Sequence, residues 1–144
     1  MSTKGRYGLR VMMDLASHYG QGPVPVEVIA KDQDISGKYI HVLVTSLRSA
    51  GLVRTSRGPS GGYELARKPT SITALDVISA LEGRSAPVEC VMDASTCPRA
   101  GQCVARDVWC DVAAAVDGVL SKLTLSQLSA RQLARQETSQ DFCI

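Results

Sequence analysis

Five cysteines are the residues of this sequence best suited to chemistry, and three of them share one segment: Cys90, Cys97 and Cys103. Pro98 and Gly101 in that segment favour a flexible loop, which can bring three thiolates around one centre at spacings that no helix or strand allows. Structural zinc sites use closer cysteine pairs, whereas iron–sulfur clusters are held mainly by thiolates. The spacing alone leaves open a metal or cluster site, a set of reduced structural cysteines, or a redox disulfide.

Other reactive groups are sparse. His18 and His41 are the only histidines, and no nucleophile pattern joins them. The glycine-rich run 58–62 lacks the lysine of a phosphate-binding loop and lies between two segments that favour strands. The sequence therefore predicts a protein that is not an enzyme.

Length and composition describe an ordinary globular chain. It has 144 residues, of which 44% are hydrophobic and 21% are charged, as in one domain or a small domain with an extension. No apolar run approaches a membrane span, and the charged start (Lys4, Arg6, Arg10, Asp14) is not a signal peptide. We expect a cytoplasmic protein with no membrane partner, in a compartment where disulfides are rare.

Basic residues gather in one part of the chain. The run 48–68 holds one acid, Glu64, and five bases: Arg48, Arg54, Arg57, Arg67 and Lys68. Such a patch attracts phosphates, although charge alone also fits a solvated surface.

The elements around this patch form a recognisable outline. Hydrophobic spacing predicts helices over 4–19, 25–33 and 37–50, with Ser36 as the cap of the third. Two helices joined by a short turn are typical of a helix-turn-helix. Segments 52–57 and 63–66 then predict a β-hairpin whose turn is 58–62. The fold class is mostly α with a small β-hairpin, and residues 1–83 form a winged helix-turn-helix DNA-binding domain.

The second half is expected to carry the cysteine segment and a helix for dimerisation. A capping box of Thr73 with Asp76 opens one more helix, and the cysteine-bearing loop occupies 84–103. A helix over 104–123 then carries a long apolar stripe, which the N-terminal core is too small to cover, so we expect it to pack against a second copy. Thr124 and Gln127 open a short helix, which completes a unit over 104–128, and 129–144 is expected to be a flexible tail.

Several motifs together resemble one family. Segments 2–7, 35–39, 47–53 and 57–63, and the three-cysteine loop followed by Trp109, are similar to the IscR-type (IscR/NsrR/RirA-like) winged-helix regulators of bacteria. The resemblance covers about residues 2–128. It implies a homodimeric transcription regulator that binds an operator in double-stranded DNA. It also implies that Cys90, Cys97 and Cys103 hold an iron–sulfur cluster, [2Fe–2S] first and [4Fe–4S] as the alternative, which senses redox, iron or nitrosative state.

The resemblance also implies how the protein contacts DNA. Tyr39 and its neighbours would enter the major groove, and Arg57 would reach the minor groove, whose negative potential attracts arginine. Small residues in the wing would let its backbone approach phosphates. The predicted DNA-binding residues are Ser36, Lys38, Tyr39, His41, Arg48, Arg57, Gly58, Ser60 and Gly61.

The sequence departs from the family at positions that matter for specificity and for the cluster. His41 stands where relatives often carry Glu and can donate to base acceptors instead. Arg106 stands where some relatives carry a histidine ligand, and Arg6 where others carry an acid. The fourth ligand is therefore open, and Asp107, at i+4 from Cys103, is our candidate.

Two cysteines are expected to lie outside the site, Cys110 as an apolar filler and Cys143 as a tail thiol. The alternative function is a DNA-binding regulator whose cysteines sense through thiol–disulfide chemistry, without metal.

Overall fold

The computed structural model describes residues 2–83 and 86–141, and Cys143 lies outside them. The described residues form seven α-helices, three short 3-10 helices and one antiparallel sheet of two strands. In chain order they are α1 (Thr3–Ser17), α2 (Val26–Gln33), α3 (Gly37–Ser49), β1 (Val53–Ser56), β2 (Gly62–Leu65), η1 (Pro69–Ser71), α4 (Ala74–Glu82), α5 (Glu89–Met92), η2 (Ala94–Thr96), η3 (Ala100–Gln102), α6 (Val104–Ser121) and α7 (Leu125–Asp141). The predicted winged helix-turn-helix with a long C-terminal helix is confirmed.

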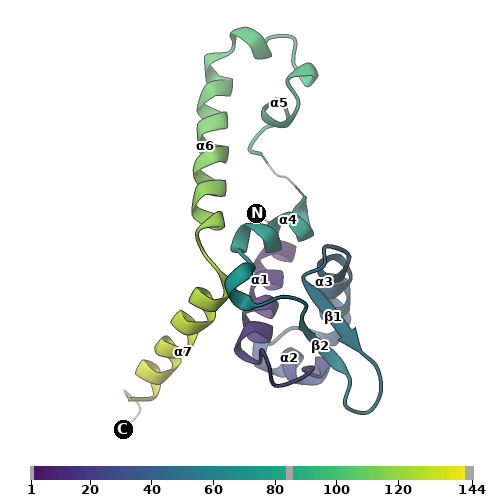
Figure 1. Ribbon diagram of the computed structural model, residues 1–144. Helices are drawn as coiled ribbons and strands as arrows, with labels where there is room; N and C mark the ends of the chain where they lie inside the picture. The colour runs from purple at the N-terminus through teal and green to yellow at the C-terminus, as the bar shows by residue number, and fades with distance from the viewer. Residues whose placement is uncertain (1, 84–85, 142–144) are drawn as a thin grey trace.

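The chain divides into a compact body and a projecting arm (Figure 1). Helices α1 to α4 and the hairpin form the body, and α6 extends away from it with α5 and the cysteine segment beside its outer half. Helix α7 continues from the base of α6 past the body, in contact with α1. Within the described residues no helix is long and apolar enough to cross a membrane.

Close packing of α1 on α4 explains two glycines in α1. A Cβ at Gly8 would lie 2.0 Å from Leu81 Cδ1, and one at Gly5 would lie 2.3 Å from Glu82 Oε1. That carboxylate accepts hydrogen bonds from the backbone N–H of Ser2 (2.7 Å) and of Gly5 (3.2 Å), so it neutralises the positive end of α1. A hydrogen bond from the Ser2 hydroxyl (2.7 Å), together with these backbone bonds, holds the pKa of Glu82 below its ordinary value, because hydrogen bonds to the carboxylate favour its charged form.

The helix-turn-helix forms as its local sequence predicts. Asp34 adopts the left-handed conformation (φ 53°) between α2 and α3, which a short polar side chain tolerates. Ser36 then caps α3 by accepting a hydrogen bond from the Tyr39 N–H (3.3 Å). One face of α3 lies in the core, where Ile40, Leu43 and Leu47 are fully buried.

The hairpin is attached to the body through Tyr63. The N–H of Val24 donates to the Tyr63 carbonyl (2.8 Å), and the Tyr63 N–H donates to the Val24 carbonyl (2.9 Å). A Cβ at Gly62 would lie 2.2 Å from the Val24 oxygen, so this contact requires glycine. The wing is therefore fixed against the segment that leads into α2.

Helix α7 is longer than the sequence predicts. Thr124 and Gln127 form the expected capping pair, and the helix continues through Asp141, so residues 129–141, which we expected to belong to a flexible tail, are helical. The start of α7 is anchored because Leu125 is fully buried and its N–H donates to the Ile72 carbonyl (2.9 Å). Contact with α1 supplies the stabilisation that the polar sequence of α7 does not reveal.

The projecting helix α6 leaves its apolar side chains in solvent. None of its residues is buried in the single chain. Val108 is 54% exposed, Val112 39%, Val116 46% and Val119 60%, along one stripe of the helix.

Asp14 of α1 predicts an unusual dependence of stability on pH. It is only 9% exposed, and its Oδ2 has no hydrogen-bond partner among the described residues. Burial raises the pKa of Asp14 above its ordinary value of 3.8; His18 opposes this shift and Asp32 adds to it. The ionised carboxylate therefore destabilises the fold at neutral pH, and that penalty disappears as pH falls through the folded-state pKa towards 3.8.

We expect Asp14→Asn to raise the free energy of unfolding at pH 7 by about 1 kcal/mol. The gain should be smaller at pH 4, because more of the wild-type carboxyl is protonated there than at pH 7, and urea unfolding at both pH values measures it. Exposed Asp111 of the projecting helix α6, replaced in the same way, is the control. An equal gain at both pH values would contradict the explanation.

Candidate nucleic-acid interface and cysteine segment

The outward face of α3 is polar, basic and accessible. Lys38, His41 and Arg48, all predicted DNA-binding residues, are exposed on it, and so are two residues that the sequence analysis missed, Val42 (54% exposed) and Thr45. Helical spacing places all five on the side opposite the buried Ile40, Leu43 and Leu47. The helical spacing of α3 would have identified Val42 and Thr45 if it had been applied to the solvent-exposed face as well as to the buried one.

The start of α3 leans on α1 through aromatic contacts. The rings of Tyr39 and Tyr7 meet edge to face, with centroids 6.0 Å apart. The guanidinium carbons of Arg6 and Arg10 lie 5.2 and 5.4 Å from the centre of the Tyr7 ring. Tyr39 is therefore half-buried rather than free, and two arginines of α1 lie near the start of α3, the second helix of the helix-turn-helix, which we call the recognition helix. Arg10 also donates to the carbonyl of Gln33, at the end of α2.

The His41 side chain on α3 contacts the wing. Its Nδ1 is hydrogen-bonded to the Tyr63 hydroxyl of the wing, and the two rings meet edge to face with centroids 5.9 Å apart. The residue that we expected to read bases is thus held by the hairpin.

The wing presents Arg57, Gly58 and Ser60 to solvent. Gly58 has φ +103°, which favours glycine, and its Cβ position faces open space. Position 61 requires glycine because of packing within the hairpin: a Cβ there would lie 2.4 Å from the Ser56 backbone oxygen. Arg54 is paired across the strands with Glu64 (2.9 Å), so Arg57 carries the free charge of this end of the hairpin.

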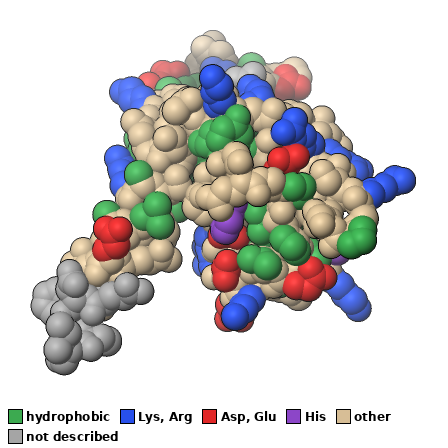
Figure 2. Space-filling view, turned by 60° about the horizontal axis from the view of Figure 1, so that its bottom comes forward, with side chains coloured by type: hydrophobic (Ala, Val, Ile, Leu, Met, Phe, Trp, Pro, Cys, Tyr) green, Lys and Arg blue, Asp and Glu red, His purple; other side chains and the backbone are tan. Residues whose placement is uncertain are grey.

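The surface around the wing is basic without being uniformly so. In Figure 2, several Lys and Arg side chains lie on the right-hand side, where the hairpin is, and others lie at the top, left and lower edges among acidic and apolar side chains. The structure therefore brings α3 and the wing together on one face, as a winged helix-turn-helix requires for entering adjacent grooves of DNA.

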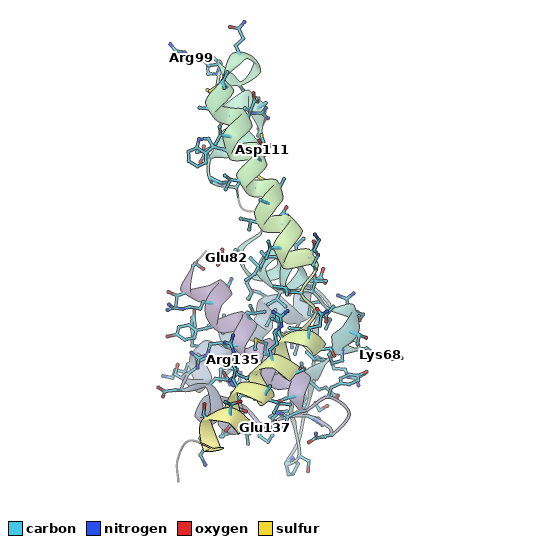
Figure 3. The ribbon with its side chains drawn as sticks, turned by 90° about the vertical axis from the view of Figure 1, so that its left-hand side faces the viewer. Lys68, Glu82, Arg99, Asp111, Arg135 and Glu137 are labelled. Carbon is cyan, nitrogen blue, oxygen red and sulfur yellow. The ribbon has the colours of Figure 1, made fainter. Side chains whose placement is uncertain are left out.

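The three loop cysteines lie far from this face. Cys90 is in α5, Cys97 follows η2, and Cys103 precedes α6; all three are half-buried and none forms a disulfide. Figure 3 shows how far this end projects, with Arg99 near the tip of the arm and Glu82 at its base. Among residues 2–83 and 86–141, no three His, Cys, Asp or Glu side chains are close enough together to hold a metal ion.

Helix α6 presents a distinct face to α5. Arg106 Nε donates to the Cys90 carbonyl (2.8 Å), which ties α6 to α5 and occupies the Arg106 side chain. Cys103, Arg106 and Cys110 are half-buried and, at i, i+3 and i+7, share this face. Asp107 is exposed in the first turn of α6, and the structure does not bring it into a ligand group with the cysteines.

The profile of one family matches nearly the whole chain. The Rrf2 family, described as iron-dependent transcriptional regulators, matches residues 1–131. The chain belongs to the Rrf2 family. The expected resemblance to IscR-type regulators is confirmed. The expectation that the chain is not an enzyme is also confirmed, because its relatives are named as transcriptional regulators.

Two kinds of Rrf2 regulator are similar to this chain. The regulator CymR of Bacillus subtilis is 41% identical over 95% of this chain and 94% of its own. The regulator IscR of Aliivibrio salmonicida is 36% identical over 89% of this chain and 76% of its own.

Solved structures of both kinds share the Rrf2 fold. The structure of CymR, the global cysteine regulator of B. subtilis, has a TM-score of 0.76 at 42% identity, covering 91% of this chain and 96% of that one. That of T. potens IscR has a TM-score of 0.75 at 38% identity, covering 92% of this chain and 87% of that one.

Proposed function

We propose that this Rrf2-family regulator binds an operator in double-stranded DNA and changes its affinity when an iron–sulfur cluster on Cys90, Cys97 and Cys103 is gained, lost or oxidised. One observation carries the proposal: three half-buried, unpaired cysteines lie on a projecting arm, remote from the DNA-binding face. Cysteines that serve only to pack the fold would be expected in the hydrophobic core of the body instead. A cytoplasmic location follows from the proposed DNA target.

The donor set fits a cluster in its chemistry. The thiols of Cys90, Cys97 and Cys103 are free, and soft thiolates are the ligands that iron–sulfur clusters prefer. Since the described conformation does not gather them, assembly would couple to ordering of the segment 86–103. When bound, the cluster would supply sensitivity to oxidants, iron supply or nitric oxide. Asp107, a partner-chain residue or water would complete the ligand set and leave it labile.

A homodimer is part of the proposal. The apolar stripe of α6 is open in the single chain, and pairing it with its copy would bury the four valines Val108, Val112, Val116 and Val119. A two-fold dimer would present two recognition helices to paired half-sites of the operator.

Direct cysteine chemistry is the second candidate. The similarity to CymR extends over more of this chain than that to IscR of A. salmonicida, and CymR is named as a global cysteine regulator. Reversible disulfide formation within the arm would then change DNA affinity without metal.

Footprinting separates the two candidates. The probe is random-sequence DNA enriched by binding to the anaerobically purified protein. If a cluster is the sensor, chelation under anaerobic conditions changes occupancy of the bounded site, and a thiol reductant does not restore it. A response to oxidant that a reductant fully reverses in iron-free protein would favour the disulfide mechanism.

Removing the wing charge should weaken specific binding. We expect Arg57→Ala to cost about 1–3 kcal/mol on the selected site, because Arg57 is exposed just after β1 and, in our proposal, its side chain enters the minor groove. Titration by fluorescence anisotropy measures the loss. Arg99→Ala removes the same charge at the far tip of the arm and should leave the affinity of the cluster-free protein unchanged. Equal affinities for wild type and Arg57→Ala would remove Arg57 from the interface.

A further inference from the structure

The wing and the recognition helix are joined by one side-chain hydrogen bond, between the Tyr63 hydroxyl and His41 Nδ1. His41 is exposed on α3, whereas Tyr63 is 9% exposed on β2. A buried anchor thus holds one nitrogen of an exposed imidazole, and the other ring nitrogen, Nε2, lies on the side of the ring away from that bond.

The backbone of Tyr63 is held by contacts that do not involve His41. Its N–H and carbonyl both pair with Val24, and it lies opposite Thr55 in the hairpin. The position of its hydroxyl is therefore set by the body of the protein, so it can orient His41.

The chemistry of the two groups decides which one donates. Burial raises the pKa of Tyr63, with Arg48 opposing the shift, so the phenol keeps its proton at neutral pH. A phenol is the stronger acid and a neutral imidazole nitrogen the stronger base, and the hydroxyl hydrogen would otherwise be left unpaired in a buried place. The Tyr63 O–H therefore donates to Nδ1, and the ring proton of His41 is on Nε2.

We propose that Tyr63 is a positioning residue that holds His41 in the Nε2–H tautomer, so that His41 presents a single hydrogen-bond donor to the major groove and, by donating to a purine N7, selects a purine over a pyrimidine on the strand that it faces. A glutamate at this position would accept a hydrogen bond from the amino group of cytosine. His41 donates instead, so the two side chains recognise opposite hydrogen-bonding groups on the base edges. The choice of base rests on the proposed function; the tautomer does not.

The tautomer can be measured without DNA. His18 is an internal contrast, because its Nδ1 faces the Asp14 carbonyl (2.9 Å), which only accepts, so His18 carries its proton on Nδ1. Nitrogen-15 NMR, recorded with both imidazoles neutral, should show a pyridine-type Nδ1 for His41 and a pyridine-type Nε2 for His18.

Two variants make this measurement decisive. Tyr63→Phe keeps the ring and should shift His41, but not His18, towards a mixture of tautomers. Tyr19→Phe removes an exposed hydroxyl and should change neither histidine. Nδ1–H on His41 in the wild type, or an unchanged His41 in Tyr63→Phe, would overturn the positioning role.

The base contact is tested on the selected operator by replacing each purine in turn with its 7-deaza analogue. One position in each half-site should weaken wild-type binding about three- to tenfold, have no effect on His41→Ala, and have a reduced effect on Tyr63→Phe. A confirmed tautomer with no such position would overturn the recognition of N7. Absence of any bounded operator would instead refute the proposed function and leave the NMR result standing.

Discussion

Val116→Glu should convert the protein into a monomer and abolish operator binding. Val116 is 46% exposed in the middle of the α6 stripe, between Val112 and Val119. In a two-fold pair the substitution would place two carboxylates in an apolar seam, where each costs several kcal/mol to bury. Analytical ultracentrifugation measures the association. The loss in operator affinity should exceed tenfold, because each monomer would contact only one half-site.

Ala114→Glu is the matched control for the dimer. Ala114 is also exposed on α6, but at about 100° per residue it lies on the side opposite Val112. This variant should remain dimeric and bind the operator. A Val116→Glu protein that still sediments as a dimer would contradict the α6 interface.

Replacing any one of Cys90, Cys97 or Cys103 with alanine should remove the visible absorbance of the anaerobically prepared protein. Each supplies one of only three thiolates in the arm segment before α6, and loss of one ligand leaves a cluster with too few soft donors. Iron content should fall in parallel with absorbance.

Cys110→Ala and Asp107→Ala complete this series. We expect Cys110→Ala to keep its spectrum, because Cys110 lies seven residues beyond Cys103, roughly 10 Å along the helix axis. Asp107→Ala should show a shifted spectrum or faster cluster loss. Loss of the cluster only in the Cys110 variant would assign the fourth position to Cys110, which shares the α5-facing side of α6 with Cys103.

Features encoded by neighbouring residues were predictable from the sequence. Ser36 caps α3, and Thr73 caps α4 with Asp76, because a capping bond joins groups three residues apart. The same holds for the hairpin, whose turn chemistry is local.

Features that depend on distant contacts were not predictable. The length of α7 depends on α1, and the tight packing at Gly8 depends on Leu81. The Tyr63 bond to His41 joins residues whose proximity only the docked wing creates. For the same reason, spacing identified the candidate cysteines but gave no information on how the segment arranges them.

The most direct test of the proposed sensor is to measure iron, acid-labile sulfide and visible absorbance in the wild-type protein purified without oxygen. We expect a coloured protein that contains iron and sulfide, both lost when Cys103 is replaced by alanine. A colourless protein that contains stoichiometric zinc, or that contains no metal and switches its DNA affinity through a disulfide, would contradict the cluster-based sensor.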